Sequence, residues 1–206
     1  MTHVNHVNEN FKNGVLFYLH QGIIKVANER TSSTLGNRGL YIGASDLAKA
    51  IGCFRLAVLD KVASSHSHNL LELLRFERGH WQEDGIAAAL VANAPNVIRQ
   101  LQIEFRTPGN NLCRFHLDMV MVTQASTTVL ESKSMGNEPG SKPYESHHAQ
   151  IRMQIVALHH FWDTPAFRIA GTKDELRTFP EFAQSLGYSG TIQRNIKGAL
   201  VCITMT

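Results

Sequence analysis

The spacing of apolar residues along the chain predicts helices first and strands afterwards. From Ser45 to Ala63 apolar residues recur at helical spacing with a break near Gly52, which predicts two short helices with Ser45 as the N-cap of the first. A long helix is predicted over Asn69–Ala92, where an Asn-Ala-Pro-Asn segment stops it. Alternating segments separated by turn residues then predict a meander of three strands, at Val97–Arg106, Cys113–Val122 and Thr128–Ser134.

The regions on either side of this central part carry weaker patterns. Residues 1–37 are polar and mixed, with one apolar patch at Val15–Leu19, and we interpret them as an N-terminal appendage or first helix. Residues 38–206 are interpreted as one domain, because a chain of 206 residues fits a single core. The tail beyond residue 171 predicts no definite element. Between the strands and the tail we expect an exposed loop, a helix and a strand, at Met135–Ser146, His147–Trp162 and Phe167–Gly171.

Composition favours a globular protein of the cytoplasm. Apolar residues make up 43% of the chain and charged residues 18%, so the chain can bury enough apolar surface to offset its conformational entropy. The net charge of +3 permits a polyanionic partner without requiring one. Three scattered cysteines without a C-x-x-C pair argue against a zinc ribbon or a disulfide framework. The chain shows neither a signal pattern nor a long apolar span, so we expect no membrane contact.

The second predicted hairpin brings three ionisable residues onto one face. If its turn spans residues 123–128, Val122 faces Val129 and Asp118 faces Lys133. Asp118 and Glu131 are then diagonal neighbours, close enough to share one divalent cation. Lys133 lies two residues beyond Glu131 and therefore on the same face. Two carboxylates and an ammonium form a chemically sensible site for phosphodiester hydrolysis, although an exposed ion pair also explains an isolated Glu-x-Lys.

A third carboxylate lies in the middle of the long predicted helix. Glu83 interrupts a stripe of residues that share one helical face and are otherwise mostly apolar. A buried carboxylate needs a compensating partner, such as a metal ion or a basic residue. We therefore expect Glu83 to approach the metal site, and the alternative is a salt bridge to Arg78 or Arg99.

Several ordered blocks resemble one family, the PD-(D/E)xK nucleases, and within it the lambda-exonuclease and YqaJ-type phage recombination exonucleases. The segment Arg38-Gly39-Leu40-Tyr41-Ile42-Gly43-Ala44-Ser45-Asp46 is similar to an opening R…I-G-G-S-D block, in which the Arg and Ser hold a 5′-terminal phosphate. Arg78-Gly79-His80-Trp81-Gln82-Glu83 resembles the R-G-x-x-x-E helix, whose Glu belongs to the metal site. The resemblance thus implies phosphate-binding roles for Arg38 and Ser45, and a metal-binding role for Glu83.

The later blocks carry the catalytic strands and a second helix. Phe115-His116-Leu117-Asp118 stands where the family has S-P-D-G, and Leu130-Glu131-Ser132-Lys133 where it has E-x-K. The segment from His148 to Gln154 resembles the Y-x-x-Q-x-Q helix, which makes Gln150 a candidate site residue. His116, Leu117 and Met119 depart from the family pattern. The related RecB-like nucleases of CRISPR systems usually bind an iron–sulfur cluster with four cysteines, and three scattered cysteines argue against that branch.

The resemblance implies an α/β fold in which a central mixed sheet of four or five strands, flanked by helices, forms a restriction-endonuclease-like core. It also implies a Mg²⁺- or Mn²⁺-dependent deoxyribonuclease that resects linear duplex DNA from 5′ ends for recombination, with an origin in a phage or mobile element. A single-strand annealing protein and a homotrimer around DNA are the partners it suggests. An endonuclease or RecB-like trimming nuclease on the same core is the alternative, and a non-catalytic DNA-binding module is a third reading.

Two other residue types have alternative explanations. The histidine pairs His66/His68, His147/His148 and His159/His160 suggest zinc, but no Cys or carboxylate spacing accompanies them, so we expect them at the surface or partly buried. His80, one turn before Glu83, suits either the metal site or the core. Trp81 and Trp162 suit either base stacking or core packing.

Overall fold

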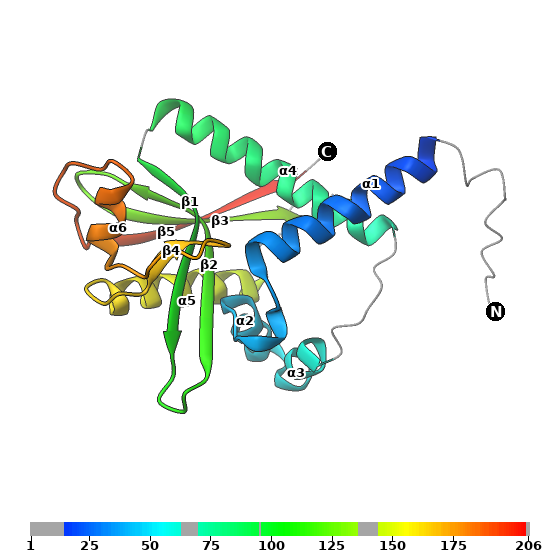
Figure 1. Cartoon of the computed structure of the whole chain (residues 1–206), viewed down its shortest axis with the longest axis horizontal. Coiled ribbons are helices and arrows are strands. Elements are labelled where there is room, and N and C mark those ends of the chain that lie inside the picture. Colours follow the sequence, from blue (N-terminus) through cyan, green and yellow to red (C-terminus); the bar gives the residue numbers. More distant parts are fainter. Residues whose placement is uncertain (1–14, 63–69, 95, 136–143, 205–206) are drawn as a thin grey trace.

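A five-stranded mixed sheet with helices on both faces forms the centre of the molecule (Figure 1). The computed structural model describes residues 15–62, 70–94, 96–135 and 144–204. The strand order is β4-β1-β2-β3-β5, in which only the β3–β5 pair is parallel. The strands are β1 Val97–Arg106, β2 Leu112–Val122, β3 Thr127–Met135, β4 Phe167–Ile169 and β5 Ile196–Thr204.

Six α-helices lie in the described residues: α1 Val15–Arg30, α2 Ala44–Gly52, α3 Phe54–Val62, α4 Leu70–Asn93, α5 Glu145–Phe161 and α6 Phe179–Ser185. A π-helical turn, Thr31–Leu35, and a 3₁₀ turn, Arg38–Leu40, connect α1 to α2. In Figure 1, α4 lies above the sheet and α5 below it. The α/β class, the mixed sheet and the flanking helices are therefore confirmed.

Alternation along the strands separates two apolar layers. Met119 and Leu130 pack against Ala87 of α4, whereas Val120 and Val129 belong to the larger core, which also includes Ile151 of α5. Since neighbouring residues of a strand point to opposite faces, each central strand can fill both layers. On the α4 side, Arg30 at the end of α1 also donates to the buried Glu77 carboxylate of α4, at 2.9 Å.

The predicted elements match the observed ones closely where their patterns are regular. The β1 bounds are as predicted, and those of the long helix, β2, β3 and α5 differ by one or two residues. The prediction of Ser45 as an N-cap was wrong, because Gly43 caps α2 and its amide donates to Asp46 of the first turn at 2.9 Å. The strand at Phe167 is shorter than predicted, and α6 and β5 occupy the tail for which we predicted nothing. Most of the predicted loop, residues 136–143, lies outside the described residues.

The predicted register of the β2–β3 hairpin was wrong by two residues. Val122 pairs with Thr127 and Met119 with Leu130, because the connection occupies only residues 123–126 and is closed by a Thr123 amide to Ser126 carbonyl bond of 2.9 Å. A shift of two residues preserves the face of every side chain, whereas a shift of one would reverse it. The predicted common face of the ionisable residues is therefore retained.

Gly171, which follows β4, provides a test of the packing between β4 and the turn after α1. Gly171 has φ +81°, and a Cβ there would lie 2.2 Å from the Ser33 carbonyl oxygen. Gly187 has φ +95° with nothing near its missing Cβ. We expect Gly171→Ala to lower the free energy of unfolding by about 2–5 kcal/mol, combining left-handed strain with overpacking, and Gly187→Ala by only about 1–2 kcal/mol. Urea unfolding of both variants measures the difference, and equal losses would contradict the close contact.

Candidate active site

Asp118 and Glu131 lie close together where the β2–β3 ladder ends. The antiparallel pairs run from Val122 with Thr127 to Met119 with Leu130, so Asp118 and Glu131 are the next residues of the two strands. After burial, the negative charge of Glu131 is the largest influence on the pKa of Asp118, which indicates that the two carboxyl groups are near each other. The Ser132 amide donates to Oδ2 of Asp118 at 2.9 Å, which fixes this carboxylate against the neighbouring strand.

Glu131 is almost completely buried, and three side chains compensate its charge. Its exposed fraction is 1%. Lys133 and Gln150 each donate to Oε1 at 2.5 Å, and Gln154 donates to Oε2 at 2.8 Å. A buried carboxylate without partners would cost several kcal/mol, so this set of donors is what allows Glu131 to be buried. The structure therefore places the predicted Glu131, Lys133 and Gln150 together.

Gln154 belongs to the same cluster and was not predicted as a site residue. Its side chain is fully buried, and besides Glu131 its Nε2 donates to the His116 carbonyl oxygen at 3.0 Å. Gln154 therefore ties α5 to both β2 and β3. Its position, four residues after Gln150 and on the same helical face, is the sequence signal that could have identified it.

Glu83 reaches the same region from α4, but by way of a different partner from those predicted. Gln100 of β1 donates to its Oε1 at 2.6 Å, and His80 Nδ1 lies 3.7 Å from its Oε2. The alternative salt bridges of Glu83 were wrong: Arg78 donates to Ser134, and Arg99 pairs with Asp84.

Gln100 has an unusual backbone conformation at this place. The β1–β2 register places Gln100 opposite Asp118, and its φ of 52° is in the left-handed region that residues other than glycine rarely adopt. Such strain persists only where the surrounding structure holds it, and it often occurs at functional sites. In this chain it coincides with the bond between Gln100 and Glu83.

Glu131 and Glu83 influence the ionisation of Asp118 electrostatically. Burial raises the pKa of Asp118 well above its ordinary value, and the negative charges of Glu131 and Glu83 raise it further. Burial alone would lower the pKa of Lys133, but the attraction of Glu131, then of Asp118 and Glu83, outweighs burial and raises it. Lys133 is thus a firmly protonated cation, whereas Asp118 lacks full compensation for its negative charge.

This donor set suits a hard divalent cation chemically. Mg²⁺ and Mn²⁺ prefer carboxylate oxygens, and an added positive charge would relieve the repulsion around Asp118. Among the described residues, however, no three His, Cys, Asp or Glu side chains converge as a ready-made metal site. The reason is visible in the contacts, because Glu131 is turned toward Lys133 and the glutamines of α5, and Glu83 toward Gln100. The chemistry fits a cation, and binding one requires these side chains to reorient.

The predicted phosphate-binding pair is also brought together. The Arg38 guanidinium donates to the Ser45 hydroxyl at 3.2 Å and lies 3.4 Å from the Asp46 carboxylate. Asp46 is also bound by Lys61 of α3 at 2.6 Å. Ser45 is in the first turn of α2, where free backbone N–H groups and the helix dipole favour an anion.

Basic side chains surround His116, two residues before Asp118 on β2. Burial lowers the pKa of His116 to about 4, with further lowering by the positive charges of Arg38, Arg114 and Arg168. The neutral ring accordingly contacts Gln102 through Nε2 at 3.1 Å and the edge of the Tyr41 ring. This basic group is therefore centred on His116, which precedes Asp118 by two residues along β2.

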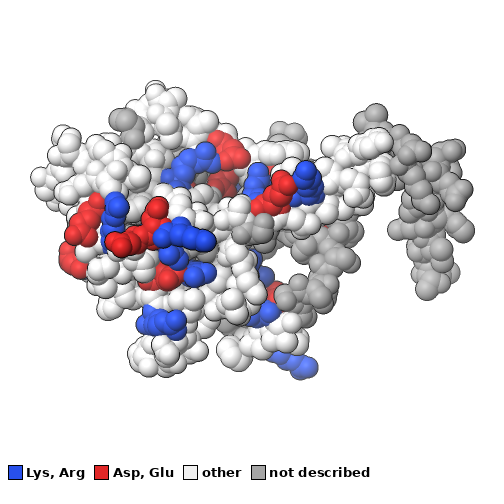
Figure 2. Space-filling model, viewed as in Figure 1, with Lys and Arg blue, Asp and Glu red and all other residues white. Residues whose placement is uncertain are grey.

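Glu104 neutralises part of the positive charge. Its Oε2 accepts hydrogen bonds from Arg114 and Arg168, both at 2.6 Å. On the face shown in Figure 2, basic and acidic side chains are intermixed. The arginines around His116 are thus paired with carboxylates, Arg38 with Asp46, and Arg114 and Arg168 with Glu104.

The other candidates from the sequence have ordinary positions. Trp162 is buried against Phe179, so core packing explains it, whereas Trp81 is exposed. His66 and His68 lie outside the described residues, and His159 and His160 are exposed. All three cysteines are free. None of the helices in the described ranges is long and apolar enough to cross a membrane.

The raised pKa of Asp118 leads to a stability prediction. A carboxyl whose native pKa is raised destabilises the native state when ionised, and this cost grows as pH rises above the unfolded value of about 3.9. We expect Asp118→Asn, which keeps an acceptor for the Ser132 amide, to raise the thermal midpoint at neutral pH without divalent cations. A gain of about 1 kcal/mol would raise it by about 2–4 °C. Calorimetry from acid to neutral pH should show the gain disappearing in acid, and an unchanged or lower midpoint at neutral pH would contradict the repulsion.

Comparisons with known proteins identify no family for this chain. No family model matches it, and no curated protein matches it. Among solved structures, one described as "Crystal structure of SSO0001" aligns over 87% of this chain and 90% of that chain, with 13% identity and a TM-score of 0.43. A similarity of this degree supports no conclusion about function.

Proposed function

We propose that the chain is a Mg²⁺- or Mn²⁺-dependent deoxyribonuclease with a PD-(D/E)xK-type, restriction-endonuclease-like core, acting from the 5′ ends of linear duplex DNA. The observation that carries the proposal is the proximity of Asp118 and Glu131 at the end of the β2–β3 ladder, with Lys133 bound to Glu131. The negative charges of Glu131 and Glu83 near Asp118 are a reason for this site to attract a cation.

Asp118 and Glu131 would hold the cation, with Glu83 as the third carboxylate. When bound, the ion supplies the positive charge that stabilises the developing charge on the phosphoryl oxygens and acidifies the attacking water. Lys133, protonated throughout the neutral range, orients the water or the scissile phosphate by donating hydrogen bonds. Gln150 and Gln154 hold the Glu131 carboxylate in place from α5.

Arg38 and Ser45 would bind the terminal phosphate. Arg38 presents a planar group of donors suited to phosphate oxygens, and Ser45 adds a hydroxyl at a helix N-terminus. The positive charge of Arg38 lowers the pKa of His116, which precedes Asp118 by two residues on β2. An enzyme that starts at a 5′ end needs such a pair, whereas an endonuclease does not.

The first test of the proposal is the requirement for metal and for the carboxylates of Asp118 and Glu131. We expect cleavage of end-labelled linear duplex only with Mg²⁺ or Mn²⁺, and we expect Asp118→Asn and Glu131→Gln to reduce it to the level seen with chelator. Wild-type protein should also gain thermal stability on adding Mg²⁺, because a ligand that binds only the native state stabilises it, and Asp118→Asn should not. Asp163→Asn, which removes an exposed carboxylate, is the matched control. Full cleavage by either site variant, or by wild type in chelator, would refute the proposal.

The second test concerns recognition of the end. Arg38→Ala should reduce digestion of 5′-phosphorylated duplex about ten- to a hundredfold relative to the same duplex with a 5′-hydroxyl, because a charge-assisted contact contributes about 1.5–3 kcal/mol. Arg106→Ala removes an exposed arginine that donates to Asn110, and it should leave the preference unchanged. Equal effects of Arg38→Ala on both ends, or rapid nicking of closed circular DNA by wild type, would favour an endonuclease on the same core.

A further inference from the structure

The two edges of the sheet differ in how well they are protected. At one edge, β4 has only three residues, and the backbone of Arg177 covers its outer side through a bridge to Phe167. At the other edge, β5 runs for nine residues in uninterrupted register with β3, and within the described ranges no strand pairs with its outer side. Proteins usually protect long edges with charges, prolines or bulges. β5 has the sequence IKGALVCIT, with one charged residue and no proline.

The apolar layers on both faces of the sheet remain partly open beside β5. On the α4 face, Ala199 and Val201 of β5 and Leu90 of α4 are only partly buried, although they pack on Met119 and Leu130. On the α5 face, Gly198 lies against Ile155. The next residue of α5, Val156, is 65% exposed. An added strand would thus gain apolar contacts on both of its faces.

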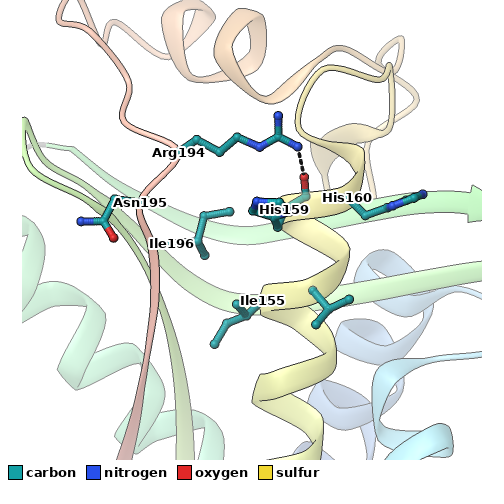
Figure 3. A pocket seen from close by; sticks show the side chains of 7 residues that line it. Ile155, His159, His160, Arg194, Asn195 and Ile196 are labelled. Atoms are coloured by element: carbon teal, nitrogen blue, oxygen red, sulfur yellow. Dashed lines mark hydrogen bonds between the residues drawn. The ribbon is translucent and has the colours of Figure 1, made fainter.

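A groove lies on the α5 face at the start of β5 (Figure 3). Its volume is about 470 Å³, and residues of α5 and of the segment 194–196 line it, among them Val156, His160 and Ile196. Figure 3 shows Arg194 reaching across one end, where it donates to the His159 carbonyl oxygen, and Ile155 and Ile196 pointing into the space between helix and strand. The groove therefore continues the open edge along the helix that flanks it.

We infer that β5 is the interface at which two copies of this chain pair edge to edge, so that their sheets join into one sheet of ten strands. A closed two-fold pairing of identical strands is antiparallel, with the axis perpendicular to the sheet. Such an axis keeps α5 of both copies on the same face. In a pairing centred on Leu200, it sets Cys202 of the second copy opposite Gly198, at the edge of the groove, and Val201 and Ile203 beside the partly open layer on α4.

The sequence of β5 suits pairing with itself. In a pairing centred on Leu200, Lys197 lies opposite Ile203, so the two lysines are six residues apart along the ladder, about 20 Å. No like charges then oppose each other, and the remaining side chains are apolar or small. A second copy of β5 therefore brings no like charge opposite another and adds mostly apolar or small side chains, which is why we choose it as the occupant over an unrelated peptide.

The experiment combines mass and hydrogen exchange on the full chain. We expect light scattering after gel filtration to give twice the chain mass at micromolar concentration, and the amides of residues 196–204 to become protected as concentration rises. Val156→Glu adds a charge at an exposed position of the groove and should shift the protein to monomer. Val62→Glu, at a valine of α3 that is 79% exposed, is the matched control and should remain dimeric.

Three outcomes would overturn the inference. They are a monomer throughout the micromolar range, a trimer, which two-fold pairing cannot form, and a dimer that Val156→Glu leaves intact while β5 amides exchange freely. None of these measurements depends on nuclease activity, so failure of the dimer and failure of the proposed function are distinguishable.

Discussion

The compensation of the buried Glu131 charge is the interaction on which the arrangement of the site depends. A nearly fully buried carboxylate is tolerated only with donors on every side, and here these come from β3 itself through Lys133 and from α5 through Gln150 and Gln154. Gln154 also holds the backbone of β2, so the same bonds fix the position of α5 on the sheet. The electrostatic needs of one residue thus determine how a helix and two strands meet.

The parts of the fold that could be predicted are those that depend on local pattern. β1 and β2 alternate over part of their length and are bounded by turn residues, so their positions followed from the sequence. β5 could not be predicted, because its side chains fill layers on both faces and its run of apolar and small residues has no clear period. Its parallel register with β3 is also a long-range contact that no local signal specifies.

The sequence predicted that the site residues share one face of the strands, but it did not predict their contacts. The two-residue period placed Asp118, Glu131 and Lys133 together even though the assumed turn was too long, since an error of two preserves the face. The partners of Glu83 were missed because Gln100 reaches it from another element and from a left-handed backbone conformation. Patterns of charge suggested arginines for that role, while the chain uses an amide, which compensates the carboxylate by hydrogen bonding without adding charge.

The pKa values of two residues of β2, Asp118 and His116, are shifted in opposite directions. At Asp118, burial and two carboxylates raise the pKa; at His116, burial and three arginines lower it. Both pKa shifts have the direction expected for a buried ionisable group that has charges of its own sign nearby. In the proposed nuclease, the carboxylates would attract the cation and the arginines the phosphate, so a phosphodiester beside a bound cation would need both groups.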